Sequence, residues 1–546
     1  MHKPSNPGTL NLILLLIVCF FSFFMNNQVI PADLMESRNL ATAQEMVKEG
    51  NYLTPTLNGE LRLEKPPLPT WIAAGIEKIT PDNLVVQRCA TGLMGTLMAF
   101  FLFLLVAKLT RHATVGLFAA FVLATCYNVI MMSRTATWDI YCHSLMLGAI
   151  YFFVCAVENR GKQWGRFLLA GIFMGLSFLG KGPVSFYALL LPFLIAYFAI
   201  LRPRMRGKAV PVVLMVVACL LVACWWYIYI YIFHTDLAMQ VLHKESTAWV
   251  NHNVRPIYYY WQFPAEAGIW VLFWITAIFS YFWKRRTRDS EQRRNYTFSI
   301  VWMLASLILL SVIPEKKTRY LLPLLIPGAM NIAFYFYHIL KGRLSQAEKA
   351  LFKINTIVIA IILLAIPVGL YLMFVRVGQL SWLLFGLITL ISVGLAVFLI
   401  MMAFHRMGVR VKEVITGVVL TMVMVTGLCL VPIGRMFIND ERHGLKQVRE
   451  TAAYDLPFYY NADEELRMEL VYDANKIIRP IDANSDIHAI TPFVILSGKP
   501  LDTLFPGDST LTVDPIDTYD NNWRKRDSRR YNQALVRHVG VVREAE

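Results

Sequence analysis

Charged side chains are scarce in this chain. Asp, Glu, Lys and Arg make up 16% of its 546 residues, whereas an average soluble domain carries about 25%. Hydrophobic residues make up 56%, and the mean hydropathy is +0.49. A soluble protein of this length would divide into roughly three or four domains and would need more polar surface. The composition also excludes a collagen, a coiled coil, a disordered chain and a disulfide scaffold. A protein that crosses a membrane several times remains.

The chain also lacks the motifs of several common sites. Its eight cysteines form no Cys-x-x-Cys pair, lie in or beside apolar runs, and end at Cys429. We interpret them as small buried hydrophobic residues rather than as zinc ligands or disulfide partners. There is no P-loop and no Gly-x-Gly-x-x-Gly fingerprint, so we expect no nucleotide cofactor.

Long apolar runs recur along the chain. A helix needs about 20 apolar residues to span about 30 Å of hydrocarbon. By this measure the sequence predicts thirteen transmembrane helices, and the first run, which no small-residue cleavage site follows, is expected to stay as an anchor. The runs lie near residues 10–26, 88–107, 113–132, 138–157, 167–180, 184–201, 210–233, 266–283, 297–313, 320–340, 354–375, 380–403 and 413–432.

The distribution of Lys and Arg predicts the orientation. With the N-terminus in the cytoplasm, the predicted inner segments carry 23 Lys and Arg against four Asp and Glu, an excess of 23 − 4 = +19. This exceeds the net charge of +15 of the whole chain. Positive charge concentrated on the cytoplasmic side is typical of membrane proteins. We therefore expect no nucleic-acid partner and a multi-pass membrane protein with its N-terminus in the cytoplasm.

Three predicted outer segments are long: residues 27–87, 234–265 and 433–546. The last is polar, with strand-like runs at Leu470–Tyr472, Phe493–Leu496 and Ala534–Val542. The sequence therefore predicts an all-α polytopic membrane domain over residues 1–432, which carries the first two loops, and a small α/β domain outside the membrane over residues 433–546.

Three short outer turns carry charge where topology disfavours it. One is Pro314–Tyr320 with Lys316, Lys317 and Arg319, another is Lys181-Gly182-Pro183, and the third is Ser133–Asp139 with Arg134. Such cations either extend toward lipid headgroups or form a functional site. Lys and Arg together suit a phosphate group, so we expect a cationic pocket for a lipid phosphate at the outer leaflet.

The first outer loop adds carboxylates to this picture. Asp33 and Glu36 are three residues apart, so they share a face if the segment is helical. Asp139 lies at the outer mouth of the fourth predicted span. Carboxylates beside a phosphate site suit glycosyl transfer, in which a base acts on an acceptor hydroxyl. The alternative is that Asp33 and Glu36 simply favour the dipole of a helix N-terminus.

These residues together resemble a known family. Asp33-x-x-Glu36-Ser-Arg38, Gly50-Asn51-Tyr52 and Glu64-Lys65-Pro66-Pro67 are similar to the first periplasmic loop of bacterial 4-amino-4-deoxy-L-arabinose (lipid A) transferases and of the wider protein O-mannosyltransferase-like superfamily. Lys181-Gly182-Pro183 and Lys316–Pro323 resemble further segments of that superfamily. The resemblance covers about residues 10–340 and implies the type-C glycosyltransferase fold. It also implies a bacterial inner (plasma) membrane protein whose small α/β C-terminal domain is periplasmic.

The resemblance also implies roles for individual residues. Met35 stands in place of an aspartate of the family, so either Asp33 or Glu36 is implied as the base, helped by Asp139. Glu64 matches a ligand of a divalent metal (Zn, Mg or Mn), with His252 or His243 as its histidine partner. The donor phosphate would be bound by the matching residues and by two further cations of the basic turns: Arg38, Lys65, Lys181, Lys316, Lys317, Arg319 and Tyr320.

The implied function is transfer of a sugar from undecaprenyl phosphate to a lipid A-type or other envelope glycolipid on the periplasmic face, with inversion at the anomeric carbon. A protein O-mannosyltransferase-like enzyme that acts on exported proteins is the alternative within the same class. A lipid or solute transporter is the alternative from another class. The ionisable residues gather at the outer ends of the predicted spans, with few at mid-span, which favours surface chemistry over alternating access.

Overall fold

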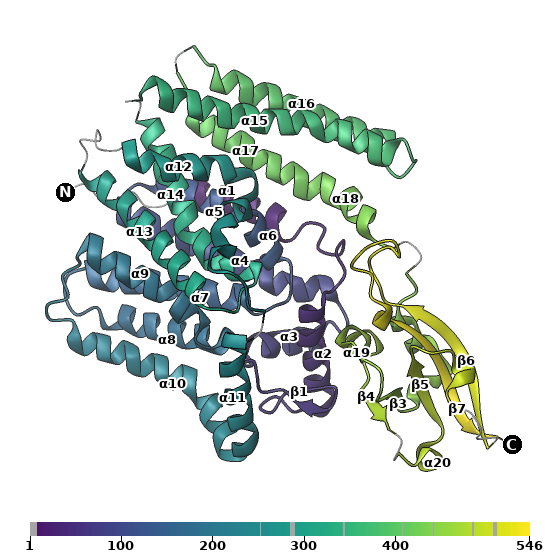
Figure 1. Cartoon of the computed structure of the whole chain (residues 1–546). Coiled ribbons are helices and arrows are strands. Elements are labelled where there is room, and N and C mark those ends of the chain that lie inside the picture. Colours follow the sequence, from purple (N-terminus) through teal and green to yellow (C-terminus); the bar gives the residue numbers. More distant parts are fainter. Residues whose placement is uncertain are drawn as a thin grey trace. The chain divides into compact units, whose positions relative to one another are not determined.

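The computed structural model describes residues 8–251, 253–283, 290–341, 344–406, 408–439, 442–482, 485–505 and 510–545. The chain divides into two compact units. Unit 1 contains residues 1–27, 64–69 and 88–432, and unit 2 contains residues 28–63, 70–87 and 433–546. In Figure 1 the first is built of helices and the second combines helices with a sheet. The domain roles that we assigned to these segments stay a prediction.

Unit 1 is helical, as the sequence predicts. Nine of the described helices are long and apolar enough to cross a membrane, or ten if α5 and α6, bent by 68°, form one span. The number of crossings stays a prediction, although a helix covers each of the thirteen predicted runs. These helices are α1 (Thr9–Phe23), α4 (Leu84–Thr110), α5 (Ala113–Ala124), α6 (Tyr127–Ser133), α7 (Asp139–Glu158), α8 (Trp164–Lys181), α9 (Leu191–Ala196), α10 (Ala209–Phe233), α12 (Val271–Trp283), α13 (Ser290–Val312), α14 (Leu322–Leu340), α15 (Gln346–Leu370), α16 (Trp382–Ala403), α17 (Val411–Met424) and α18 (Leu430–Phe437), while α11 (Thr235–Asn251) follows α10.

Small residues let α8 approach its neighbours closely. A Cβ added at Gly171 would lie 2.2 Å from the carbonyl oxygen of Met215 on α10, and one added at Gly175 would lie 2.5 Å from the Cβ of Val222. Glycine at such positions is typical of helix pairs packed in a membrane, where van der Waals contact drives association. The helix α8 also packs against α7, and this pair carries two of the predicted site residues.

Two buried arginines hold the C-terminal end of α1. The Nε of Arg134 donates to the carbonyl of Ser22 at 2.8 Å, and its guanidinium also donates to the carbonyl of Met25 at 2.6 Å. Arg88 donates to the carbonyl of Asn27. Cations at a helix C-terminus satisfy carbonyls that have no partner within the helix. Arg134, which lies in one of the charged outer turns of the sequence, therefore has a structural partner.

Unit 2 contains a five-stranded mixed sheet with strand order β4-β3-β5-β7-β6. The strand β3 (Phe458–Asn461) runs parallel to β4 (Ile478–Ile481) and to β5 (Phe493–Ser497), whereas β7 (Val536–Glu544) runs antiparallel to β5 and to β6 (Leu511–Asp520). Its core includes Tyr459, Ile481, Phe493, Ile495, Leu511 and Val542. The predicted strands at residues 493–496 and 534–542 are confirmed in β5 and β7.

The predicted strand Leu470–Tyr472 is wrong, because these residues lie in the helix α19 (Met468–Ala474). A short apolar run has no periodicity that separates a strand from a buried helix. Tertiary packing decides here: α19 contacts α2 (Leu34–Glu49) and buries Val471.

A hairpin of the first outer segment contacts the edge of this sheet. The strands β1 (Thr56–Leu57) and β2 (Glu60–Leu61) flank Asn58-Gly59, whose positive φ angles of 56° and 78° suit a two-residue turn. The Asn58 side chain donates to the carbonyl of Ile478 at 2.9 Å and accepts from its amide at 2.7 Å. Residues 28–63 and 433–546 therefore fold as parts of one unit, which also contains α3 (Leu68–Ile79) and α20 (Ile487–Ile490).

Candidate functional site

An ion pair between α7 and α8 lies at the centre of the candidate site. Asp139 opens α7 and Lys181 closes α8. The Lys181 ammonium pairs with the Asp139 carboxylate, and the side chains are only 9% and 2% exposed. Gly182 follows with a φ of 69°, which suits glycine and ends the helix directly after the lysine. Two charged turns that are far apart in the sequence therefore meet.

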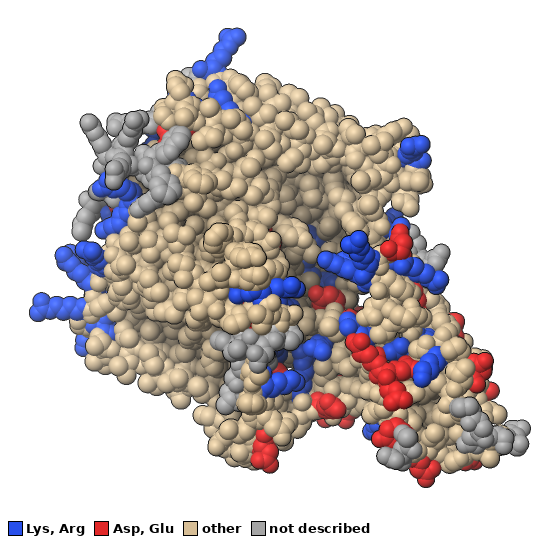
Figure 2. Space-filling view, viewed as in Figure 1, with Lys and Arg blue, Asp and Glu red and all other residues tan. Residues whose placement is uncertain are grey.

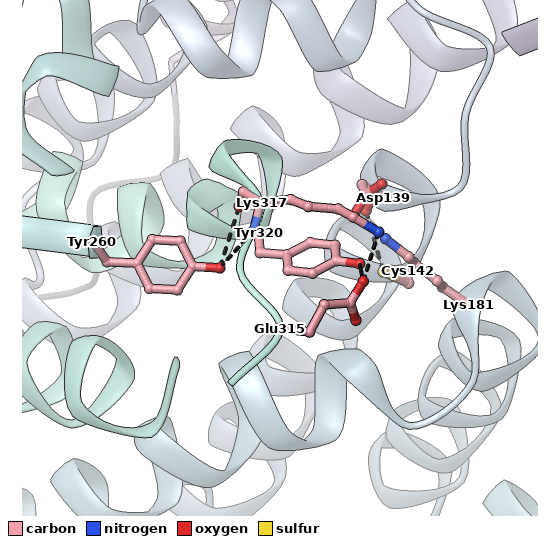
Figure 3. A network of polar contacts seen from close by, with 7 residues as sticks. All are labelled: Asp139, Cys142, Lys181, Tyr260, Glu315, Lys317 and Tyr320. Atoms are coloured by element: carbon pink, nitrogen blue, oxygen red, sulfur yellow. Dashed lines mark hydrogen bonds and ion pairs between the residues drawn. The ribbon is translucent and has the colours of Figure 1, made fainter. Parts of the chain in front are cut away.

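The turn at residues 314–320 supplies the second half of the cluster. The Lys317 Nζ contacts Glu315 Oε1 at 2.6 Å, and the Tyr320 hydroxyl donates to the same oxygen at 3.4 Å. The Lys317 amide donates to the Tyr260 hydroxyl at 3.1 Å. Figure 3 shows these side chains beside Asp139 and Lys181. Tyr260 comes from the 3-10 segment Ile257–Trp270, so residues of four separate segments converge here.

Three cations surround one aromatic ring. The Lys181 Nζ lies 4.9 Å from the centroid of the Tyr320 ring, the Lys317 Nζ lies 5.7 Å from it, and the Arg319 Cζ lies 5.8 Å from it. The electron-rich face of an aromatic ring attracts cations. Asp139 and Glu315 offset two of the three positive charges, so the cluster keeps an excess of one. Such a group of ammonium and guanidinium donors can bind a phosphate.

Lys316 differs from its neighbours. It is 3% exposed, and its ammonium donates to the carbonyls of Ile313 at 2.6 Å and Arg255 at 3.2 Å. Burial lowers its pKa below the usual value of a lysine. The neighbouring backbone is paired as well, because the Lys316 amide donates to the carbonyl of Asn253 at 3.2 Å. These contacts hold the turn in place. A role of Lys316 in binding phosphate stays a prediction.

The predicted metal ligands are only partly described. Glu64 forms an ion pair with Lys244 at 2.9 Å. His252 lies outside the described residues, and the described chain contains no group of three or more His, Cys, Asp or Glu side chains that could hold a metal ion. The described partner of Glu64 is a cation, which does not indicate a metal site. The metal stays a prediction.

Three of the remaining predicted residues, Asp33, Glu36 and Arg38, lie on α2 or just before it, in unit 2. The Asp33 side chain caps α2 by accepting from the Glu36 amide at 2.8 Å, so the helix N-terminus that was one interpretation of the sequence is confirmed. Glu36 is buried and Arg38 is exposed. Lys65, of unit 1, is half-buried. Asp33 still has a second carboxylate oxygen, so capping does not exclude a role as a base.

A cavity of about 520 Å³ lies within unit 2, beside α2 and the first strand of the sheet. Its lining includes Gln44, Lys48, Tyr454, Lys476 and Arg479, and it includes none of the predicted site residues. The cavity therefore adds no support for their roles.

Glu315 and Tyr260 were not predicted from the sequence. Glu315 lies in the basic turn at residues 314–320, directly before Lys316 and Lys317, and an acid next to cations was a signal of an internal ion pair. Tyr260 belongs to the run Tyr258-Tyr259-Tyr260-Trp261, which is also typical of an interfacial aromatic belt. Its contact with Lys317 depends on long-range folding that no local pattern reports.

Comparison with known sequences adds relatives. Residues 64–228 match the family described as dolichyl-phosphate-mannose-protein mannosyltransferase. An uncharacterised protein of Aquifex aeolicus is 27% identical over 316 residues, which cover 57% of this chain and 60% of that protein. An undecaprenyl phosphate-alpha-4-amino-4-deoxy-L-arabinose arabinosyl transferase of Pseudomonas fluorescens is 25% identical over 329 residues, which cover 59% of this chain and 57% of the relative. The matched part of the chain thus spans about three fifths of the length of these relatives.

Comparison with solved structures decides the fold. The crystal structure of ArnT from Cupriavidus metallidurans bound to undecaprenyl phosphate superposes with a TM-score of 0.68, at 16% sequence identity, over 97% of both chains. The chain has the ArnT fold. The same protein in its apo state gives the same TM-score. The family match, the arabinosyl transferase relatives and this fold together bear out the resemblance that the sequence indicates.

The buried pair Asp139–Lys181 predicts a specific pattern of stability. Asp139→Asn or Lys181→Met alone should lower the free energy of unfolding by about 3–5 kcal/mol, because each leaves one buried charge without its partner. The double variant should be more stable than either single one. Thermal denaturation of the purified full chain in detergent measures this. Lys317→Met is the control, since its pair with Glu315 is more exposed and should cost about 1 kcal/mol or less. Equal stability of all four variants would contradict the assignment.

Proposed function

We propose that the chain is a membrane glycosyltransferase that takes its sugar from a polyprenyl phosphate, most directly undecaprenyl phosphate. The observation that carries the proposal is the cluster in which Lys181, Lys317 and Arg319 surround Tyr320, beside the buried carboxylate of Asp139. The ArnT fold and the matching family are further support. Each cation can donate hydrogen bonds to a phosphate oxygen.

The reaction is a displacement at the anomeric carbon of the donor sugar. An acceptor hydroxyl attacks that carbon and forms the new carbon–oxygen bond, while the bond to the phosphate oxygen breaks. The phosphate leaves with the electron pair, and Lys181, Lys317 and Arg319 stabilise the charge that develops on it. The acceptor proton passes to a carboxylate, which is Asp33 or Glu36 in this proposal. In-line attack inverts the configuration of the sugar.

Asp139 acts in this proposal through Lys181. Its carboxylate holds the ammonium in the cluster at the end of α8 and helps to keep the lysine charged in a site with little water. It is thus a positioning residue for the phosphate site. Arg38 and Lys65 are further candidates for contact with the donor phosphate, on the resemblance alone.

The acceptor is a lipid A-type or other envelope glycolipid in this proposal, and the reaction takes place on the periplasmic face of the inner membrane, with the N-terminus in the cytoplasm. The arabinosyl transferase relatives support a glycolipid acceptor. The match of residues 64–228 to a mannosyltransferase family supports the second candidate, a Ser or Thr side chain of an exported protein.

Two substitutions of Asp33 separate its roles. Asp33→Asn keeps a side chain that caps helices as well as Asp does, but it removes the base. If Asp33 is the base, Asp33→Asn should lower transfer from a polyprenyl-phosphate donor in membranes by about 10²–10⁴-fold with unchanged thermal stability. Glu36→Gln is the parallel test of the other carboxylate. Full activity of both the Asp33→Ala and the Glu36→Ala variant would contradict the mechanism.

The cations predict how binding of the donor changes. Lys317→Gln and Arg319→Gln should each raise the KM for the polyprenyl-phosphate sugar by about tenfold or more, since a hydrogen bond to a charged group contributes about 1.5–3 kcal/mol. Steady-state kinetics in membranes measure this. Lys499→Gln, which removes an exposed cation of unit 2, is the control and should leave KM unchanged. An unchanged KM in both cluster variants would contradict the phosphate site.

Mass spectrometry can identify the acceptor. Cells that lack the protein should lose one sugar from a single class of envelope glycolipid, and expression of the wild-type chain should restore it. Loss of a hexose from exported proteins, with unchanged glycolipids, would instead support the mannosyltransferase-like alternative. Expression of the Asp33→Asn and Glu36→Gln double variant is the control that ties the sugar to catalysis.

A further inference from the structure

A strongly basic loop joins β6 to β7 in unit 2. Residues 524–530, Arg-Lys-Arg-Asp-Ser-Arg-Arg, carry five basic side chains against one acidic one. Lys525, Arg526, Arg529 and Arg530 are exposed. Arg524 lies over the ring of Trp523, with its Cζ 4.1 Å from the ring centroid. The loop thus presents cations to its surroundings next to an amphipathic aromatic side chain.

The loop stands out against an acidic background. Residues 438–522, which precede it in the same unit, hold seven Lys and Arg against sixteen Asp and Glu. The space-filling view shows Lys and Arg gathered over the yellow loop that lies next to α18 in Figure 1, whereas many Asp and Glu of this unit lie over its strands (Figure 2). The positive charge is therefore concentrated in one part of the unit, although residues 438–522 carry more acidic than basic side chains.

Hydrogen bonds fix the base of this loop. The Asn522 side chain donates to the carbonyl of Asn532 at 2.9 Å and accepts from its amide at 2.8 Å. Asp520, the last residue of β6, is buried and accepts from the Tyr531 hydroxyl at 2.7 Å and from the Asn522 amide at 2.9 Å. The Asp520 carboxylate is thus used in contacts within the fold.

Chain connectivity places the loop near a membrane surface. The last candidate span covers Val411–Phe437. Asn439 follows its end by two residues, and its amide donates to the carbonyl of Trp523 at 2.8 Å. A segment two residues beyond a span end lies within a few ångströms of it, and the Debye length at physiological salt is about 8 Å. The base of the basic loop, at Trp523, therefore lies close to the end of this span.

We infer that the loop at residues 523–530 is a docking surface for the phosphate groups of anionic lipids in the membrane leaflet where the last span ends. Clusters of basic residues beside a span end attract such lipids, and tryptophan favours the same interfacial depth. Arg529 and Arg530, adjacent and exposed, provide planar donors that match two phosphate oxygens. This inference does not depend on the proposed transferase activity, because it concerns bound lipid.

Native mass spectrometry of the purified full chain tests the inference. The chain is mixed with phosphatidylglycerol or with phosphatidylcholine, and bound lipids are counted. Arg529→Gln with Arg530→Gln should weaken binding of phosphatidylglycerol by about tenfold and leave phosphatidylcholine unchanged. The matched control, Arg479→Gln with Lys499→Gln, removes two exposed cations elsewhere in unit 2 and should bind as the wild type does. Equal binding by all three chains, or equal losses in both variants, would overturn the inference.

A second measurement needs only the wild-type chain. Hydrogen exchange of residues 523–531 is compared in nanodiscs of pure phosphatidylcholine and in nanodiscs that contain about one third phosphatidylglycerol. Exchange of the loop amides should slow with the anionic lipid, whereas the amides of β3 should not change. Identical exchange of the loop in both membranes would also overturn the inference, because it would show no contact with the phosphate groups of the anionic lipid.

Discussion

The candidate site depends on neutralisation of a buried lysine. Lys181 lies at the end of an apolar helix, where an ammonium without a partner would be strongly disfavoured, and Asp139 is the carboxylate that makes the position tolerable. Their pairing fixes the start of α7 against the end of α8. Gly182 then turns the chain immediately after the lysine. The other cations gather around Tyr320, whose ring also lies beside this lysine.

This arrangement explains how several cations remain together without a bound phosphate. Asp139 and Glu315 each pair with one lysine, so the charges repel one another less than three isolated cations would. The aromatic face of Tyr320 stabilises them further. In the proposed reaction, the phosphate of the sugar donor binds to ammonium and guanidinium groups that are already in place. Such preorganisation costs little at the moment when charge develops on the leaving phosphate.

The sequence predicted the parts of this site better than their contacts. The apolar runs predicted the helices, and the basic turns at residues 181–183 and 314–320 indicated Lys181, Lys317 and Arg319, because charge in an outer turn departs from the expected topology. Nothing local indicated that Asp139 pairs with Lys181, since that contact depends on how α7 packs against α8. The same basic turn also indicated Lys316, but the ammonium of Lys316 donates to backbone carbonyls and not to the cluster around Tyr320. Periodicity likewise failed at residues 470–472, where packing against α2 selects a helix.

The C-terminal segment has a structural role that follows from unit 2 alone. The helix α2 packs on α19, and Lys48 near its end donates to the carbonyl of Asn475. Glu45 accepts from Thr56 and from the amides of Asn58 and Gly59, so it ties α2 to the hairpin that contacts β4. A carboxylate at the start of α2 therefore takes its orientation from a fold that residues 433–546 complete. If the acceptor base is on α2, as proposed, the C-terminal segment contributes to catalysis by holding that helix, although it supplies none of the predicted catalytic residues. The absence of a recognisable catalytic motif in this segment is then expected, because packing residues carry no such signature.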